Sequence, residues 1–95
     1  AASEALIRYL ATELAPRGIR VNSVAPSIVE TDAVKHIFGQ DATKSLMEHA
    51  AADNPSGRAV KPQDYCDLIR YLASPAAAFI TGQVVYVNGG ANLSA

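Results

Sequence analysis

Apolar residues recur at two spacings along the chain, and these spacings predict where its first helix and strand lie. Leucines recur every four residues through residues 1–15, which predicts a helix there. Pro16 ends this helix, and Gly18 suits the left-handed conformation that often follows one. Residues 19–25 carry apolar side chains on both faces, as expected of a strand that helices cover on both sides.

Residues 33–54 are the least regular part of this pattern. Gly39 separates two predicted helices, which run over residues 33–38 and 42–52. Asp41 is the predicted cap of the second helix, and a cluster of turn residues follows its end. We interpret residues 33–54 as a mobile flap beside a ligand site.

Regular spacing returns after this flap. Pro62 suits the first position of a helix, and Ser74 predicts the cap of a second, short helical piece. The predicted buried stripe of the longer helix consists of Tyr65, Leu68, Ile69 and Leu72. A β-rich run predicts a strand over residues 83–87, and an Asn-Gly-Gly turn closes it.

The order of elements is helix, strand, small helices, helix and strand, which predicts an α/β fold. A strand, a helix and a second strand imply a parallel pair with a right-handed crossover. Two strands alone are marginally stable, so we expect further strands to be supplied from elsewhere. The helical pattern already runs at Ala1 without a capping residue, which suggests a piece of something longer.

Composition narrows the possible functions without identifying one. A chain of 95 residues with a net charge of −1 and no basic run argues against binding to nucleic acid or anionic membranes. No apolar run approaches the roughly 20 residues that span a bilayer. The single cysteine, Cys66, suggests a reducing, cytoplasmic setting. His36 and His49 lack neighbours at ligand spacing, so no metal site is expected.

The most informative stretch is the loop that follows the first predicted strand. Ligands of open α/β sheets bind beyond the carboxyl ends of the strands. Pro26 stops this strand, and a short loop with free backbone groups leads to the hydroxyl of Thr31. We therefore expect a ligand at this loop. The alternative for Thr31 is that it caps the helix that follows.

Several short motifs occur in an order that identifies a family. Residues 13–26 read ELAPRGIRVNSVAP, residues 80–83 read ITGQ and residues 87–90 read VNGG. Together they resemble the C-terminal part of a short-chain dehydrogenase/reductase. The resemblance implies that residues 1–95 form the C-terminal segment of one domain, a doubly wound parallel-sheet Rossmann fold. The dinucleotide-binding half would precede Ala1, together with the catalytic serine, tyrosine and lysine, so the segment alone would be inactive.

Within this family, residues 31–36 (TDAVKH) and 55–58 (PSGR) most resemble enoyl-acyl carrier protein reductase III. The resemblance implies that the whole enzyme uses NADPH to reduce the double bond of a carrier-bound acyl chain in fatty acid biosynthesis. The 3-oxoacyl carrier protein reductases share the other motifs, and a small carbonyl substrate and NADH also stay open. A homodimer or homotetramer is implied as well.

The family resemblance also assigns cofactor contacts to the loop. The backbone of Val29 would bond the nicotinamide carboxamide, and the Thr31 hydroxyl would reach the carboxamide or the pyrophosphate. Pro26 and Ile28 would pack near the nicotinamide ring. Ser27 stands where the family usually has glycine, so it either strains the backbone or places a hydroxyl near the cofactor.

The same resemblance suggests a substrate wall and leaves one alternative function. Val34, Ile37 and Phe38 are the predicted wall of the acyl-chain site. The alternative is a fragment without catalysis that acts as an oligomerisation or interaction module through its first helix and last strand.

Overall fold

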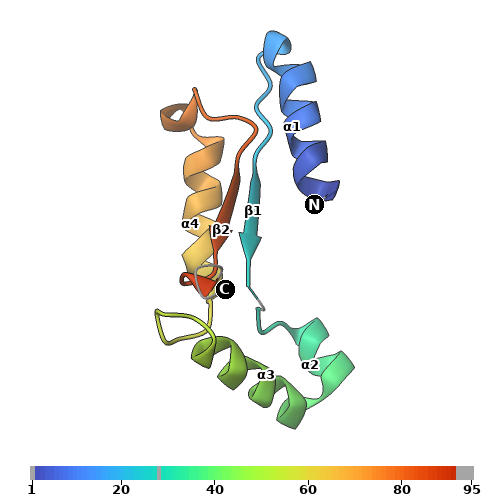
Figure 1. The fold of residues 1–95 in the computed structure, drawn as a ribbon, viewed down its shortest axis with the longest axis vertical. Coiled ribbons are helices and arrows are strands. Elements are labelled where there is room, and N and C mark those ends of the chain that lie inside the picture. Colours follow the sequence, from blue (N-terminus) through green and yellow to red (C-terminus); the bar gives the residue numbers. More distant parts are fainter. Residues whose placement is uncertain (1, 28, 92–95) are drawn as a thin grey trace. The chain divides into compact units, whose positions relative to one another are not determined.

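The computed structural model describes residues 2–27 and 29–91 and divides into two compact units. The first unit contains the residues up to Ala25 and Cys66–Tyr86, and the second contains Pro26–Tyr65 and the residues from Val87. The elements (Figure 1) are α1 (Ala2–Leu14), η1 (Ala15–Arg17), β1 (Ser23–Pro26), α2 (Asp32–Phe38), α3 (Gln40–Ala52), α4 (Pro62–Ala73), η2 (Pro75–Ala77) and β2 (Val84–Val87).

The two strands pair in parallel, and the predicted α/β architecture is confirmed. The Ser23 N–H donates to the Gln83 carbonyl at 2.8 Å, and four residues later the Ser27 N–H donates to Val87 at 3.3 Å. Both strands therefore advance in the same direction, as their arrows do in Figure 1. Their carboxyl ends meet at Pro26 and Val87.

The first strand is shorter at its start than predicted. It begins at Ser23 instead of residue 19, and it includes Pro26. The reason is that the Val21 N–H donates to the Thr81 hydroxyl at 3.0 Å, a side-chain partner instead of a ladder partner. Pro26 fits the strand's last position because it has no N–H to leave unpaired.

Helices cover both faces of the strand pair, as predicted. A pocket lined by Glu4 of α1 and by Ala25, Val84 and Tyr86 places α1 on one face, and the Tyr86 hydroxyl donates to Glu4. Successive side chains of a strand lie on opposite faces, so Val24 lies on the other face from Ala25. There it lines a pocket together with residues of α4. The two faces of β1 therefore have different helical neighbours.

Several helix boundaries follow the sequence pattern closely. The helix predicted from Pro62 is confirmed as α4, and Gly18 has a left-handed φ of +75° after the η1 turn. The predicted stripe of α4 is only partly right, because Leu72 is buried whereas Ile69 is exposed. Ser74 occupies the cap position of η2, yet its hydroxyl donates to the Tyr71 carbonyl instead of capping.

The segment predicted as a flap, residues 33–54, contains α3 and all but the first residue of α2, and Gly39 separates the two helices as predicted. The expected cap was wrong: α3 begins at Gln40 with Gly39 as its cap residue, so Asp41 already lies in the first helical turn. Thr43 is 1% exposed, and its hydroxyl donates to the Val34 carbonyl at 3.5 Å. This contact joins α3 to α2 inside the second unit.

The apolar core of the described part of the chain is small. Its buried apolar residues are Ala11, Leu72 and Ala77. Large side chains such as Phe79 and Leu6 are exposed. In the same part of the chain, no helix is both long enough and apolar enough to cross a membrane.

Candidate functional site

The loop predicted to bind a ligand leaves β1 at its carboxyl end, in the second unit. Its first residue, Ser27, is fixed by the bond from its N–H to the Val87 carbonyl. Pro26 is exposed and Val29 is half-buried. Ile28 lies outside the described residues. The loop therefore starts from a defined anchor beside the end of β2.

Ser27 does not strain the loop. Within residues 2–27 and 29–91, every residue with a positive φ is a glycine, so Ser27 does not adopt the left-handed conformation that favours glycine. The expectation of strain at this position was wrong. The other prediction for Ser27, a hydroxyl near the cofactor, stays a prediction.

Thr31 caps α2, which confirms the alternative reading of this residue. Its hydroxyl oxygen accepts a hydrogen bond from the Val34 N–H at 3.1 Å, while its own backbone is extended. Capping uses only the oxygen's acceptor capacity, so the Thr31 O–H proton is still available to a ligand. Thr31 is exposed, and the two roles are compatible.

The three residues of the predicted substrate wall all lie on α2. Val34 is three residues before Ile37 and four before Phe38, so one helix face carries all three. Val34 is half-buried, whereas Ile37 is 71% exposed and Phe38 is 55% exposed. These exposed apolar side chains could contact an apolar ligand.

A polar cluster at the other end of the flap was not predicted. Asn54 is 8% exposed, and the Ser56 hydroxyl donates to the Gly89 carbonyl at 2.9 Å. A pocket of about 230 Å³ lies beside this contact, and its lining consists of Ser56, Arg58, Val60, Asp64, Val87, Asn88 and Gly89. The sequence shows two turn clusters, at residues 54–57 and 88–90, but nothing in either cluster indicates that the two contact each other.

An ion pair borders this pocket. Both terminal nitrogens of Arg58 donate to the Asp64 carboxylate at 2.8 Å, and the Lys61 N–H donates to it at 2.7 Å. The bonds from Arg58 are the main cause of a strongly lowered pKa of Asp64. The same contact raises the pKa of Arg58. The pair is charged throughout the neutral range and fixes the start of α4.

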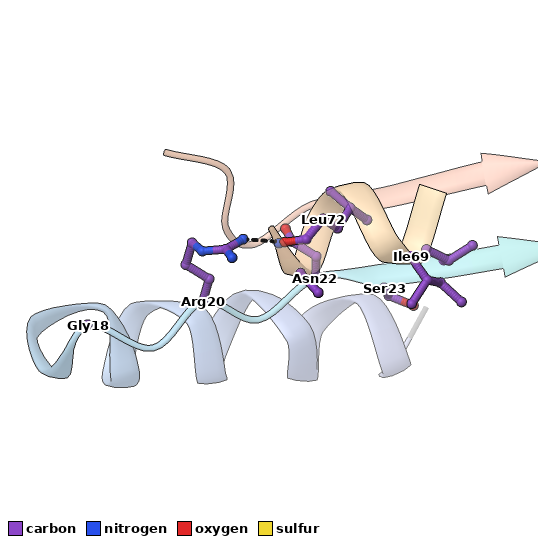
Figure 2. A pocket seen from close by; sticks show the side chains of 8 residues that line it. Gly18, Arg20, Asn22, Ser23, Ile69 and Leu72 are labelled. Atoms are coloured by element: carbon purple, nitrogen blue, oxygen red, sulfur yellow. Dashed lines mark hydrogen bonds between the residues drawn. The ribbon is translucent and has the colours of Figure 1, made fainter. Parts of the chain in front are cut away.

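The first unit has a larger pocket, which holds structural contacts (Figure 2). It has a volume of about 560 Å³, and Arg20 donates to the Leu72 carbonyl in it at 2.6 Å. Asn22 donates to the Ile80 carbonyl at 3.0 Å and accepts from the Gln83 N–H at 3.1 Å. Arg20 ties the approach to β1 to the last turn of α4, and Asn22 ties it to the turn before β2, roles that the sequence pattern did not reveal.

Metal-binding residues do not gather among the described residues. No three side chains of His, Cys, Asp or Glu lie close enough there to hold an ion. Cys66 is exposed on α4. The ligand site predicted at the loop that follows β1 stays a prediction.

Comparison with known proteins identifies what the chain is similar to. A family described as "Enoyl-(Acyl carrier protein) reductase" matches residues 1–92. The oxidoreductase YmfI of Bacillus subtilis is 42% identical over 94% of this chain and 35% of its own length. The 3-oxoacyl-[acyl-carrier-protein] reductase FabG of Vibrio cholerae is 42% identical over 87% of this chain and 32% of its own. The 7alpha-hydroxysteroid dehydrogenase of Escherichia coli is 36% identical over 95% of this chain and 34% of its own length.

Solved structures give the same result. A short chain dehydrogenase family protein from Francisella tularensis matches with a TM-score of 0.84, 28% identity and coverage of 97% of this chain and 40% of its own. A putative NAD(P)-dependent gluconate 5-dehydrogenase from Beutenbergia cavernae, with bound NADP, matches with a TM-score of 0.80 and 36% identity. The match covers 98% of this chain and 36% of that protein.

These matches extend over nearly the whole chain but only part of each relative. The chain spans about a third of the length of the curated relatives it matches. The matched part includes both strands, the loop between β1 and α2, and the flap. The chain belongs to the short-chain dehydrogenase/reductase family.

Proposed function

We propose that the whole protein is an NAD(P)H-dependent oxidoreductase, in which these residues form the carboxyl-side part of the catalytic domain. The match of residues 1–92 to an oxidoreductase family carries the proposal. Because the chain spans about a third of its relatives, the rest of the domain would supply the catalytic serine, tyrosine and lysine. The proposed setting is the cytoplasm, and the proposed assembly is a homodimer or homotetramer.

The loop at the carboxyl end of β1 would hold the nicotinamide end of the cofactor. The available O–H of Thr31 and the backbone of Val29 fit a ligand with carboxamide and phosphate groups, which need donors and acceptors. Related structures contain NADH or NADP, so both forms of the cofactor are retained in the proposal. The nicotinamide, when bound, supplies the hydride. This chain would position the nicotinamide ring against the substrate.

The proposed substrate is an acyl chain bound to a carrier, with either a 3-oxo group or a trans-2 double bond. The similarity to 3-oxoacyl carrier protein reductases supports the first, and the family description supports the second. The exposed side chains of Ile37 and Phe38 provide an apolar surface on the flap. Burial of such side chains against an acyl chain would be favourable.

The direct test measures NADH and NADPH oxidation by the whole protein with three substrates: a 3-oxoacyl carrier, a trans-2-enoyl carrier and a small ketone. Preference for one carrier-bound substrate supports the proposal and selects the reaction. Activity on the ketone alone would refute the carrier-bound substrate. An intact mass of 10.0 kDa with no companion polypeptide would instead favour the interaction module.

The proposed acyl wall has its own prediction. Replacing Phe38 with alanine removes exposed apolar area from α2, so we expect a changed preference for acyl-chain length. Ile69→Ala is the matched control, because Ile69 is also an exposed apolar residue, at 49%, but lies on α4 instead of α2. Initial rates across a series of chain lengths measure the effect. An unchanged preference in Phe38→Ala would remove Phe38 from the substrate site.

A further inference from the structure

The C-terminal end of the flap is fastened to the turn that follows β2. Both the N–H and the hydroxyl of Ser56 donate to the Gly89 carbonyl, at 3.3 Å and 2.9 Å. These two bonds join positions 33 residues apart in the sequence. They are long-range contacts in a part of the chain where most other bonds are local.

Asn54 gives this attachment a defined shape. Its side-chain nitrogen donates to the Ala50 carbonyl at 2.8 Å and to the Arg58 carbonyl at 2.9 Å. Its side-chain oxygen accepts from the Gly57 N–H at 3.0 Å. One buried amide therefore holds the last turn of α3 and the following turn together, with both of its polar atoms paired.

Gly89 approaches this turn so closely that a larger residue would not fit. A Cβ atom at this position would lie 2.7 Å from the side-chain oxygen of Asn54 and 3.2 Å from the Cβ of Ser56. Its φ of +64° also lies in the region that glycine adopts most easily. Conformation and close contact both call for glycine here.

The same stretch of chain also anchors the proposed cofactor loop. The Ser27 N–H donates to the carbonyl of Val87, two residues before Gly89. The start of the cofactor loop and the end of the flap are therefore attached to one short segment, residues 87–89. A change in the attachment at Gly89 would move the flap without breaking the bond at Ser27.

We infer that Asn54, Ser56 and Gly89 form a latch that positions the flap relative to the cofactor loop. The latch acts on substrate binding through the flap, and the cofactor loop keeps its separate anchor at Val87. Asn54, Ser56 and Gly89 are positioning residues, because none of them is assigned a contact with substrate. This inference rests on the proposed function, since it concerns the same site.

The main test compares Gly89→Ala with Gly18→Ala in the whole protein. Both glycines have positive φ, +64° and +75°, but a Cβ at Gly18 would meet nothing within 4 Å. Gly18→Ala therefore reproduces the backbone strain without the clash. We expect Gly89→Ala to raise the KM for the acyl substrate at least about fivefold with kcat changed less than about twofold, and Gly18→Ala to leave the KM unchanged. Equal effects of the two variants on KM would overturn the inference.

Ser56 provides a milder pair of variants that leaves the backbone conformation unaltered. Ser56→Ala loses the hydroxyl bond to Gly89, whereas Ser56→Thr keeps a hydroxyl at the same position. We expect the KM to rise about two- to fivefold in Ser56→Ala and to return towards normal in Ser56→Thr. Failure of threonine to restore the KM would overturn the role of the hydroxyl bond.

Amide hydrogen exchange separates the latch from the proposed function. We expect Ser56→Ala to speed exchange in residues 40–58 about tenfold and to leave the amides of β1 unchanged. Uniform acceleration along the chain, or none, would overturn the latch. If the wild-type protein oxidises neither NADH nor NADPH with any substrate, the proposed function and the KM effect both fail. The exchange data then still decide whether the latch holds the flap.

Discussion

Each of the two compact units has its own kind of internal contact. In the first unit, Arg20 and Asn22 bond to carbonyls that lie 52 and 58 residues away in the sequence. In the second unit, most polar bonds are local, and the flap helices are joined to each other through the hydroxyl of Thr43. The long-range attachment of the flap is the latch at Ser56 and Gly89.

The two kinds of contact occur at different ends of the two parallel strands. The segment before β1 is fixed by side chains that pair with backbone carbonyls, which stabilises the fold. The segments after β1 and β2 form loops and small helices, where ligands of open α/β folds bind. Segments with few buried apolar contacts open most easily, so we expect local opening to be concentrated in the second unit.

The largest effect is expected at Arg20. Arg20→Ala removes a charged donor that lies 2.6 Å from the Leu72 carbonyl, near the end of α4. Hydrogen bonds to charged groups contribute about 1.5–3 kcal/mol, so we expect the free energy of unfolding to fall by that amount. Urea denaturation of the whole protein measures it. All amides of the first unit should lose protection together.

Arg17→Ala is the matched control, because Arg17 is exposed in the preceding η1 turn. We expect it to change the free energy of unfolding by less than about 0.5 kcal/mol. Equal losses of stability in the two arginine variants would mean that the bond from Arg20 to Leu72 does not stabilise the first unit.

The second-largest effect is expected at Asn54 and should stay local to the flap. Asn54→Ala leaves the Gly57 N–H and the Ala50 and Arg58 carbonyls without their side-chain partner. Loss of such partners costs about 1–3 kcal/mol, and we expect it as faster amide exchange around residues 50–58. Asn54→Asp keeps an acceptor for Gly57 but turns a carboxylate oxygen towards the Ala50 and Arg58 carbonyls, so its effect should be at least as large as that of Asn54→Ala. Loss of protection throughout β1 would contradict a local role.

Local pattern predicted much of the fold and failed where long-range bonds decide. Helix α4 follows from its proline start and apolar spacing, and the break at Gly39 follows from the glycine itself. The true start of β1 could not be read, because Val21 bonds to a hydroxyl 60 residues away. Asp41 had the right chemistry for a cap, but α3 begins at Gln40, two residues before the predicted start at residue 42.

The candidate site shows the same limit. The capping role of Thr31 was foreseen because a cap and its partner, Val34, lie three residues apart. The latch was not foreseen, because Ser56 and Gly89 each look like an ordinary turn residue. Only the folded chain shows that a Cβ at Gly89 would collide with Asn54.

A smaller effect is expected at Thr31, which would link the flap to the cofactor. Thr31→Ala removes the cap of α2 and the O–H that we assign to the cofactor. Loss of one hydrogen bond should weaken cofactor binding by about 0.5–1.5 kcal/mol. Isothermal titration with NADH and NADPH measures this change, and Thr31→Ser should keep most of the affinity. Unchanged affinity in Thr31→Ala would leave Thr31 with the capping role alone.

The smallest effect is expected at the Arg58–Asp64 ion pair, which depends on pH. Its hydrogen bonds lower the pKa of Asp64 from the ordinary 3.8, so the folded state favours the charged carboxylate more than the unfolded state does. The resulting stability is fully present well above pH 3.8 and is lost as the pH falls from there towards the lower pKa of the folded state. Asp64→Asn should therefore destabilise the protein more at about pH 7 than at about pH 3.

The measurement is a pair of urea titrations at each pH, with Arg58→Lys as the companion variant. Lysine keeps the charge but cannot donate two parallel bonds to Asp64, so Arg58→Lys should lose part of the pH dependence. Because the pair is solvent-exposed, high salt should weaken it further. If the pair instead contributed as much as Arg20, charge pairing would hold the second unit as firmly as the first. The contrast between the two units would then fail.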